Sequence, residues 1–331
     1  MTTESRASHS GGDAFKSPLR TALVTGATGF IGSALAQRLA RSGVRVTCLV
    51  RPGSVRIATL SHIPGITVVE SPTFDSDTIR AALSYLPVEV VFHLASYGVQ
   101  PNDRDEEQLA LGNVVLTERL LMACRGLSVG RFIFSGTCSE YGPVAEPELL
   151  SEVHALAPSS PYGAAKAEAE VRGISVGREL GIPFIPLRLF GVYGVGEAPL
   201  RLIPYVIAQL LRGDVPSLTG GEQVRDLMYV DDMVDALVAT ATAPGVQPGT
   251  AYNVCTGTAV RVRAVAERVA ALLGKAGADL GLGRLPYRAD EAMWIVGDPM
   301  RFMVATGWKP TTTLTEGIHR MIAAARSRAK S

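Results

Sequence analysis

Short apolar runs alternate with longer amphipathic segments from Leu19 onward. The runs are rich in β-branched residues and are apolar at consecutive positions, as in TALVT (21–25) and VRVTCLV (44–50). Continuous apolar runs of this length are typical of strands that are buried on both faces of a parallel sheet. Further runs of this kind span 66–70, 88–95, 131–136 and 183–189.

The segments between these runs have the pattern of helices. Residues 30–43 carry apolar side chains at helical spacing and end at Gly43, and similar segments span 76–86, 106–126 and 160–180. Strand and helix in alternation predict right-handed crossovers. We therefore predict an α/β fold with a doubly wound parallel (Rossmann) sheet, whose ligands bind at the carboxyl ends of the strands.

The composition of the chain changes after about residue 188, where prolines and glycines become frequent and strands and helices no longer alternate strictly. We predict a dinucleotide-binding domain over 19–187, joined by 229–255. A smaller C-terminal substrate-binding lobe would then comprise 188–228 and 256–331. Residues 1–18 lack the apolar core of a signal peptide and are interpreted as a disordered leader.

Composition narrows the classes of function. The 331 residues are 47% hydrophobic and 19% charged with a net charge of +1, which gives no electrostatic case for nucleic acid or an anionic membrane. The four cysteines are scattered, so neither a metal site nor a disulfide framework is predicted and a reducing cytoplasm is expected. No apolar run reaches the roughly 18 residues of a membrane span.

The stretch TALVTGATGFIG runs from a strand through Gly26, Gly29 and Gly32 into a helix. Gly26 would permit a tight turn, Gly29 would let the backbone approach a pyrophosphate, and Gly32 would let helix and strand pack closely. The helix N-terminus adds free N–H groups for phosphate. A simple packing turn could also contain three glycines, but the position after the first strand favours a phosphate-binding loop.

The end of the second strand bears on the choice of cofactor. NAD-binding folds place an acidic residue there to accept hydrogen bonds from the ribose 2′-hydroxyl, whereas this chain has Val50 and Arg51. A guanidinium pairs well with a 2′-phosphate. The sequence therefore predicts NADP(H) over NAD(H), with a solvent-facing Arg51 as the alternative.

Candidate proton-transfer groups follow later in the chain. SSPYGAAKAEAE places Tyr162 and Lys166 on one face of a predicted helix, and RFIFSGTCSEYG ends a strand in hydroxyl residues that include Ser135 and Thr137. A free tyrosine has a pKa of about 10, which a nearby ammonium and an oxidised nicotinamide would lower. Tyr-x-x-x-Lys alone is more often structural. Together with the glycine loop it predicts carbonyl/alcohol interconversion, in which the cofactor carries the hydride.

These motifs together resemble the extended short-chain dehydrogenase/reductases, in the branch that modifies nucleotide-linked sugars. The resemblance runs from about Leu19 to Ile322. The motifs that carry the resemblance are TGATGFIG, VFHLAS, NVVLTERLL, SGTCSEYG, SPYGAAK, RLFGVYG, RDLMYVDD, YNVCTG and TGWKP.

The resemblance implies roles for individual residues. The catalytic residues would be Thr137, Tyr162 and Lys166, with Asn113 as a structural support. Cofactor binding would involve Gly26, Thr28, Gly29, Phe30, Ile31, Gly32, Arg51, Leu94, Ala95, Ser96, Ser135, Tyr162, Lys166 and Leu189. Substrate binding would involve Thr137, Cys138, Gly191, Arg225 and Arg288. His93 is interpreted as a packed strand residue.

The chain departs from the family pattern at several positions. Family members that are 4,6-dehydratases carry Asp-Glu directly after the catalytic threonine, where this chain has Cys138 and Ser139, which argues against a dehydratase. Gly191 stands where asparagine is common, so the diphosphate contact is expected to differ. Cys138 is interpreted as an inert buried thiol. Asp75 is a candidate for an adenine contact.

Three functions are compatible with these residues. The leading one is an NADPH-dependent reductase of a nucleotide-activated 4-keto-6-deoxy sugar, with hydride transfer to C4 and Tyr162 as proton donor. The alternatives are an NAD(P)-dependent nucleotide-sugar epimerase and a non-catalytic dinucleotide-sensing protein. The resemblance also implies a nucleotide-diphosphate sugar as substrate and a homodimer formed through the helices at about 106–126 and 160–180.

Overall fold

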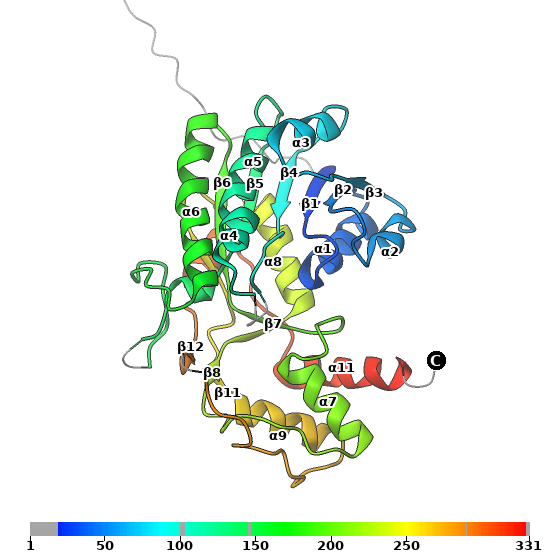
Figure 1. The fold of residues 1–331 in the computed structure, drawn as a ribbon, viewed down its shortest axis with the longest axis vertical. Coiled ribbons are helices and arrows are strands. Elements are labelled where there is room, and N and C mark those ends of the chain that lie inside the picture. The colour runs from blue at the N-terminus through cyan, green and yellow to red at the C-terminus, as the bar shows by residue number, and fades with distance from the viewer. Residues whose placement is uncertain (1–18, 100–102, 145–146, 289, 329–331) are drawn as a thin grey trace, which may run out of the picture.

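The centre of the molecule is a parallel sheet of seven strands in the order β10-β6-β5-β4-β1-β2-β3. A computed structural model describes residues 19–99, 103–144, 147–288 and 290–328 (Figure 1), so the predicted leader over 1–18 lies outside the described residues. The strands are β1 (Thr21–Thr25), β2 (Arg45–Val50), β3 (Ile66–Glu70), β4 (Val90–His93), β5 (Arg131–Thr137), β6 (Phe184–Leu189) and β10 (Tyr252–Val254). The predicted doubly wound α/β fold is confirmed.

Helices cover both faces of this sheet (Figure 1). One face packs against α1 (Phe30–Arg41), α8 (Val230–Thr242) and α10 (Met300–Thr306). The other packs against α3 (Ser76–Leu83), α5 (Leu116–Ala123) and α6 (Pro161–Leu180). The short α2 (Ile57–Ser61) lies beside β3. The inner strands β1, β4, β5 and β6 are buried along their whole length because their two faces contribute to these two cores.

The segment predicted as one helix over 106–126 has three parts. It begins as α4 (Glu106–Leu109), widens into the π-helical turn η1 (Ala110–Val115) and continues as α5. Within the π turn, buried Asn113 donates from Nδ2 to the carbonyls of Tyr97 at 3.0 Å and Leu109 at 2.9 Å. The wide turn therefore ties the helix to the segment that follows β4, and π turns of this kind are frequent at functional sites.

Helix α6 lies unusually close to the sheet. It begins at Pro161, with the Ser160 hydroxyl accepting a hydrogen bond from the Gly163 N–H at 3.1 Å. Gly173 faces the sheet, and a Cβ built there would lie 2.2 Å from the Phe184 ring. This close approach places Lys166 and Glu170 of α6 in the interior, with 1% and 2% of their surface exposed.

A second lobe lies beyond the carboxyl ends of the central strands (Figure 1). Its core is formed by α7 (Leu202–Arg212), α9 (Val262–Leu272) and α11 (Leu314–Arg328). Small sheets connect it to the centre: β7 (Gly191–Tyr193) with β9 (Leu227–Tyr229), and β8 (Val224–Arg225) between β11 (Val260–Arg261) and β12 (Trp294–Ile295). The residue boundaries proposed for the two parts stay a prediction.

The close packing of α6 leads to a stability prediction. In Gly173→Ala, the new methyl group would overlap the buried Phe184 ring, so the free energy of unfolding should fall by about 1–3 kcal/mol although alanine is the better helix former. Denaturant unfolding measures this change. Ser175→Ala, at an exposed position of the same helix, should alter stability by less than about 0.5 kcal/mol. A Gly173→Ala protein more stable than the wild type would contradict the packing.

Candidate active site

A cleft of about 1200 Å³ opens between the carboxyl edge of the sheet and the second lobe. Single ligand sites usually measure ~300–1,000 Å³, so this cleft has room for a dinucleotide and a second ligand. The predicted site residues that line it are Gly26, Thr28, Gly29, Phe30, Ile31, Gly32, Arg51, Leu94, Ala95, Ser96, Ser135, Thr137, Cys138, Tyr162, Leu189, Gly191, Arg225 and Arg288. Lys166 is the predicted site residue that does not line the cleft, because it is buried.

The glycine turn after β1 forms a tight backbone cradle. The Gly29 N–H donates to the Gly26 carbonyl at 2.9 Å, and Gly26 has φ +69°. A Cβ on Gly26 would lie 2.6 Å from the Ala95 nitrogen, and one on Gly32 would lie 2.2 Å from the Gly26 oxygen. No side chain caps α1 at Gly29, so the first N–H groups of this helix are available to a phosphate.

Thr137 and Tyr162 reach the cleft from two different elements. Thr137 is the last residue of β5 and the N-cap of the short helix η2 (Cys138–Glu140), where its Oγ1 accepts from the Ser139 N–H at 3.3 Å. Tyr162 stands in the first turn of α6 and lines the cleft together with Ser96, whose side chain acts to lower the pKa of the phenol. The structure therefore brings a threonine, a serine and a phenol to one wall of the cleft.

Burial governs the acid–base properties of the tyrosine and the lysine. Burial raises the pKa of Tyr162, and an ionised Glu140 carboxyl would raise it further. Burial also lowers the pKa of Lys166 to about 8, against the opposing effect of the Glu140 and Glu170 carboxyls. The sequence predicts a lowered tyrosine pKa with an oxidised nicotinamide alongside, but in the chain alone desolvation of the phenolate prevails. At neutral pH the phenol keeps its proton and can act as an acid.

The ammonium of Lys166 lies beneath the cleft without an acceptor. Its Nζ is buried, has no hydrogen-bond partner among the described residues, and stands 4.1 Å from the centroid of the Phe134 ring. A buried charge without a hydrogen bond is costly. An acceptor that reached Nζ would remove this cost, so an ammonium left without a partner one helical turn from Tyr162 fits a site that binds a polar ligand such as a dinucleotide.

Two arginines stand near the end of β2. Val50, where an NAD-binding acid is expected, is apolar and buried, and Arg51 is exposed at the cleft. Arg56, which sequence reasoning missed, donates to the Gly29 carbonyl at 3.1 Å, the Ser33 hydroxyl at 3.2 Å and the Gly196 carbonyl at 3.3 Å. It therefore brings a second positive charge to the glycine turn and connects that turn to the second lobe.

The opposite part of the cleft carries the predicted substrate-binding arginines. Arg225 and Arg288 contact the same carboxylate, Glu291, at 2.5 Å and 2.9 Å. Sequence reasoning missed Glu291, which orients both guanidinium groups. A Cβ on Gly191 would lie 2.6 Å from the Asp226 oxygen, so an asparagine at this position would require the backbone to move.

Three further residues that the sequence singled out, His93, Cys138 and Asp75, show no sign of taking part in the chemistry. His93 contacts the Thr25 hydroxyl at 2.8 Å and the Thr117 hydroxyl at 3.0 Å, and burial lowers the pKa of His93 to about 3, so it is a neutral strand residue. Cys138 is half-buried at the cleft and not fully buried as predicted, but desolvation raises its pKa to about 11, which supports an inert thiol. Asp75 caps α3 by accepting from backbone N–H groups of that helix.

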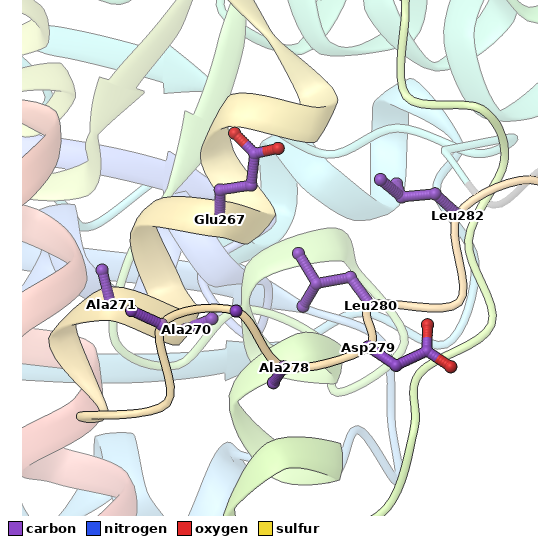
Figure 2. Close-up of a pocket in the computed structure, with 9 residues that line it drawn as sticks. Glu267, Ala270, Ala271, Ala278, Asp279, Leu280 and Leu282 are labelled. Atoms are coloured by element: carbon purple, nitrogen blue, oxygen red, sulfur yellow. The ribbon is translucent and has the colours of Figure 1, made fainter.

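A second cavity, of about 590 Å³, lies in the other lobe between α9 and the loop that follows it (Figure 2). Its lining is mainly alanine and leucine, and Figure 2 shows the carboxylates of Glu267 and Asp279 well apart. The Asp279 carboxylate already accepts hydrogen bonds from the Gly281 N–H and from Arg284.

In the described part of the chain, no cluster of side chains could hold a metal ion. No helix there has the length and apolar character needed to cross a membrane.

Comparisons with known proteins extend this description. Residues 22–255 match the NAD dependent epimerase/dehydratase family. The chain is 29% identical over 312 residues to a trifunctional UDP-glucose 4,6-dehydratase/UDP-4-keto-6-deoxy-D-glucose 3,5-epimerase/UDP-4-keto-L-rhamnose-reductase of Arabidopsis thaliana. That match covers 90% of this chain but 46% of the plant protein, so the chain spans about half of that relative's length.

Two further relatives match almost from end to end. The dTDP-6-deoxy-L-talose 4-dehydrogenase (NAD(P)(+)) of Kitasatospora kifunensis is 30% identical, and the match covers 92% of this chain and 95% of the relative. The UDP-glucose 4-epimerase of Thermotoga maritima, solved with UDP-glucose, has a TM-score of 0.85 at 27% identity. That superposition covers 93% of this chain and 99% of the epimerase.

The geometry of the glycine turn leads to a binding prediction. In Gly32→Ala, the added methyl group would displace the Gly26 carbonyl and spoil the cradle, so affinity for NADPH and NADH should fall at least about tenfold. Isothermal titration calorimetry measures both affinities. Gln37→Ala, one turn along the same helix, is the control and should bind as the wild type does. Unchanged affinity in a folded Gly32→Ala protein would show that the turn does not hold the dinucleotide.

Proposed function

We propose that this chain, which belongs to the NAD dependent epimerase/dehydratase family, is an NADPH-dependent reductase of a nucleotide-activated 4-keto-6-deoxy sugar. Within the extended short-chain dehydrogenase/reductases, it belongs to the branch that acts on nucleotide sugars. The chain is an oxidoreductase by family. The observation that carries the finer proposal is the Tyr162 phenol, which burial keeps protonated beside Ser96 in the cleft that contains Thr137 and the glycine turn. A protonated phenol is the form required to reduce a ketone.

Thr137, Tyr162 and Lys166 would each have a different role in the reduction of the ketone. Bound NADPH would supply the hydride to C4 of the sugar. The Thr137 hydroxyl would donate a hydrogen bond to the ketone oxygen and orient it, and Tyr162 would donate its proton to that oxygen as it becomes an alcohol. The Lys166 ammonium would stabilise the phenolate that remains, because an opposite charge nearby favours the ionised form.

The remainder of the cleft suits the diphosphate of a nucleotide sugar. Arg225 and Arg288 line it, and guanidinium groups bind phosphate through paired hydrogen bonds. Glu291 would hold both side chains in place before the substrate arrives. Gly191 leaves no room for the asparagine that is common at its position, so the phosphate contacts of this chain would rest more on the two arginines.

The epimerase is the second candidate, and the likeness to a UDP-glucose 4-epimerase supports it. An epimerase oxidises and re-reduces the same carbon and keeps its cofactor bound, whereas a reductase releases the spent cofactor after each turnover. The arginines at the end of β2 favour NADP(H) and hence net reduction. A dehydratase is disfavoured because Cys138 and Ser139 follow Thr137. A non-catalytic sensor would have no need for the complete set of Thr137, Tyr162 and Lys166.

We also propose a homodimer formed through η1, α5 and α6. Leu111, Met122 and Val171 expose 40%, 43% and 60% of their surface on these helices. A partner helix pair would cover these apolar side chains. The ion pair between Arg172 of α6 and Glu118 of α5, at 2.5 Å, holds the two helices together within one chain.

The cysteines support a reducing compartment, in line with the cytoplasmic location predicted from the sequence. All four are free thiols, and Cys48, Cys124 and Cys255 are buried. Disulfides are rare in the cytosol. The location stays a prediction.

Replacing the proposed proton donor tests the mechanism. Tyr162→Phe should lower kcat for a keto-sugar substrate by about 10²–10⁴-fold, since general acid catalysis contributes that much. Affinity for NADPH should stay within about threefold of the wild type. Tyr85→Phe, at a tyrosine that is 93% exposed, is the control. A Tyr162→Phe enzyme as fast as the wild type would rule out this donor.

The substrate class is tested with TDP-, UDP-, GDP- and CDP-linked 4-keto-6-deoxy sugars. With one of them, loss of NADPH absorbance should match formation of a 6-deoxy sugar nucleotide one to one. Purified protein that retains stoichiometric dinucleotide, and interconverts sugar nucleotides without consuming NADPH, would favour the epimerase instead.

Cofactor choice is tested at the end of β2. Arg51→Asp replaces a partner of the 2′-phosphate by an acceptor for the 2′-hydroxyl, so the ratio of kcat/KM for NADPH to that for NADH should fall at least about tenfold. Steady-state kinetics with both cofactors measure the ratio. The control is Arg45→Asp, exposed at the opposite end of the same strand. An unaltered preference in Arg51→Asp would remove Arg51 from cofactor selection.

A further inference from the structure

A buried pair of carboxyl groups lies behind the catalytic set. Glu140, at the end of η2, is fully buried, and Glu170 of α6 is 2% exposed. The two carboxyls approach the same guanidinium, that of Arg188. Arg188 of β6 donates to both oxygens of Glu170, at 2.6 Å and 3.1 Å. Its Nε lies 3.6 Å from Oε2 of Glu140.

The hydrogen bonds divide the two carboxyls into different roles. Glu170 accepts from Nε and Nη2 of Arg188 with its two oxygens, in a bidentate pair, and is therefore the charged partner of Arg188. Glu140 Oε1 accepts from the Thr137 N–H at 2.7 Å, but Oε2 finds no donor among the described residues. A carboxyl oxygen in such a place can be satisfied by a proton of its own, donated to the neighbouring carboxylate. Two buried carboxyls beside one guanidinium can share a proton, because ionising both is costly when they are close together.

The surroundings agree with a neutral Glu140. Burial and the charge of Glu170 raise the pKa of Glu140 well above its ordinary value. The titratable and charged groups that interact with it are Cys138 of its own turn, Tyr162, Lys166 and Glu170 of α6, and Arg188 of β6. Tyr141, the next residue, is hydrogen-bonded to Arg188. Gly136 makes room for the carboxyl, since a Cβ there would lie 2.7 Å from Glu140 Oε1.

We propose that Glu140 is a positioning residue for the reduction, held as a neutral carboxylic acid that donates from Oε2 to Glu170 and accepts from the Thr137 N–H at Oε1. This inference rests on the proposed function. Through the second hydrogen bond, Glu140 fixes the turn that aims the Thr137 hydroxyl at the substrate oxygen. Because it is neutral, Glu140 does not offset the positive charge of Lys166, and that charge is left to stabilise the phenolate of Tyr162.

The charge state of Glu140 therefore controls the proton donor. An ionised Glu140 would raise the pKa of Tyr162 and stabilise the protonated form of Lys166. The phenolate would then be harder to form, and proton transfer to the ketone would slow. Reduction should decline as the pH rises through the pKa of Glu140, because the carboxylic acid loses its proton there.

The location of the proton is tested first, without any sugar substrate. Infrared spectra at pH 7 should show the C=O stretch of a buried carboxylic acid in the wild type, and Glu140→Gln should lose it. Glu197→Gln is the control, because Glu197 is another buried carboxyl, with a pKa raised to about 7 by burial. A wild-type spectrum without a band that depends on Glu140 would overturn the proposal even if the enzyme reduces sugars as expected.

Two amide variants then separate charge from structure. Glu140→Gln keeps an acceptor for Thr137 and a donor for Glu170, so kcat at pH 7 should stay within about threefold of the wild type and the decline at high pH should move to higher pH. In Glu170→Gln, the negative charge passes to Glu140, so the acid band should also disappear while kcat falls at least about tenfold.

Thermal unfolding of both variants, together with NADPH titration, checks that each is folded and binds cofactor. Equal losses of kcat in the two variants, with unchanged pH profiles, would mean that the pair only supports the fold and would overturn the positioning role. If no nucleotide sugar is reduced by the wild type, the proposed function fails, and the infrared comparison still decides the state of Glu140.

Discussion

The arrangement of this molecule depends on one buried positive charge. The Nζ of Lys166 lies under the floor of the cleft, beside the Phe134 ring and without an acceptor among the described residues. A lysine reaches this position because glycines let α6 pack tightly against β6, and the Glu170 carboxylate favours its charged form. Tyr162, one helical turn earlier in α6, lines the cleft, so under the proposed function this charge would favour a developing phenolate there.

The parallel sheet explains why the remaining groups gather around that charge. All seven central strands end at the same edge, so the glycine turn after β1, the segment after β4 and Thr137 at the end of β5 open into one cleft. The second lobe adds Arg225 and Arg288 from the opposite side. Arg56 connects the two halves through carbonyls of Gly29 and Gly196. The residues proposed to bind cofactor, donate the proton and bind substrate thus line one cleft although they are far apart in sequence.

The sheet and most of the cleft residues could be predicted because short stretches of the sequence carry the signal for both. Apolar runs and glycine spacing identify strands and turns, and the family motifs identify Thr137, Tyr162 and Lys166. The π turn around Asn113 was missed because one extra residue in a helix leaves the apolar pattern intact. Arg56, Glu291 and the Glu140–Glu170 pair were missed because their roles arise from contacts between distant segments. The direction of the Tyr162 pKa also depended on burial, which no local pattern measures.

The central claim is that a hydride from NADPH reaches C4 of a keto sugar while Tyr162 supplies the proton. A single turnover with NADPH deuterated at the transferred position of the nicotinamide measures this directly. The account predicts one deuterium at C4 of the 6-deoxy sugar product and release of an equal amount of unlabelled NADP⁺. Conversion of the sugar nucleotide without incorporation of deuterium, or with the label retained on the bound cofactor, would contradict it.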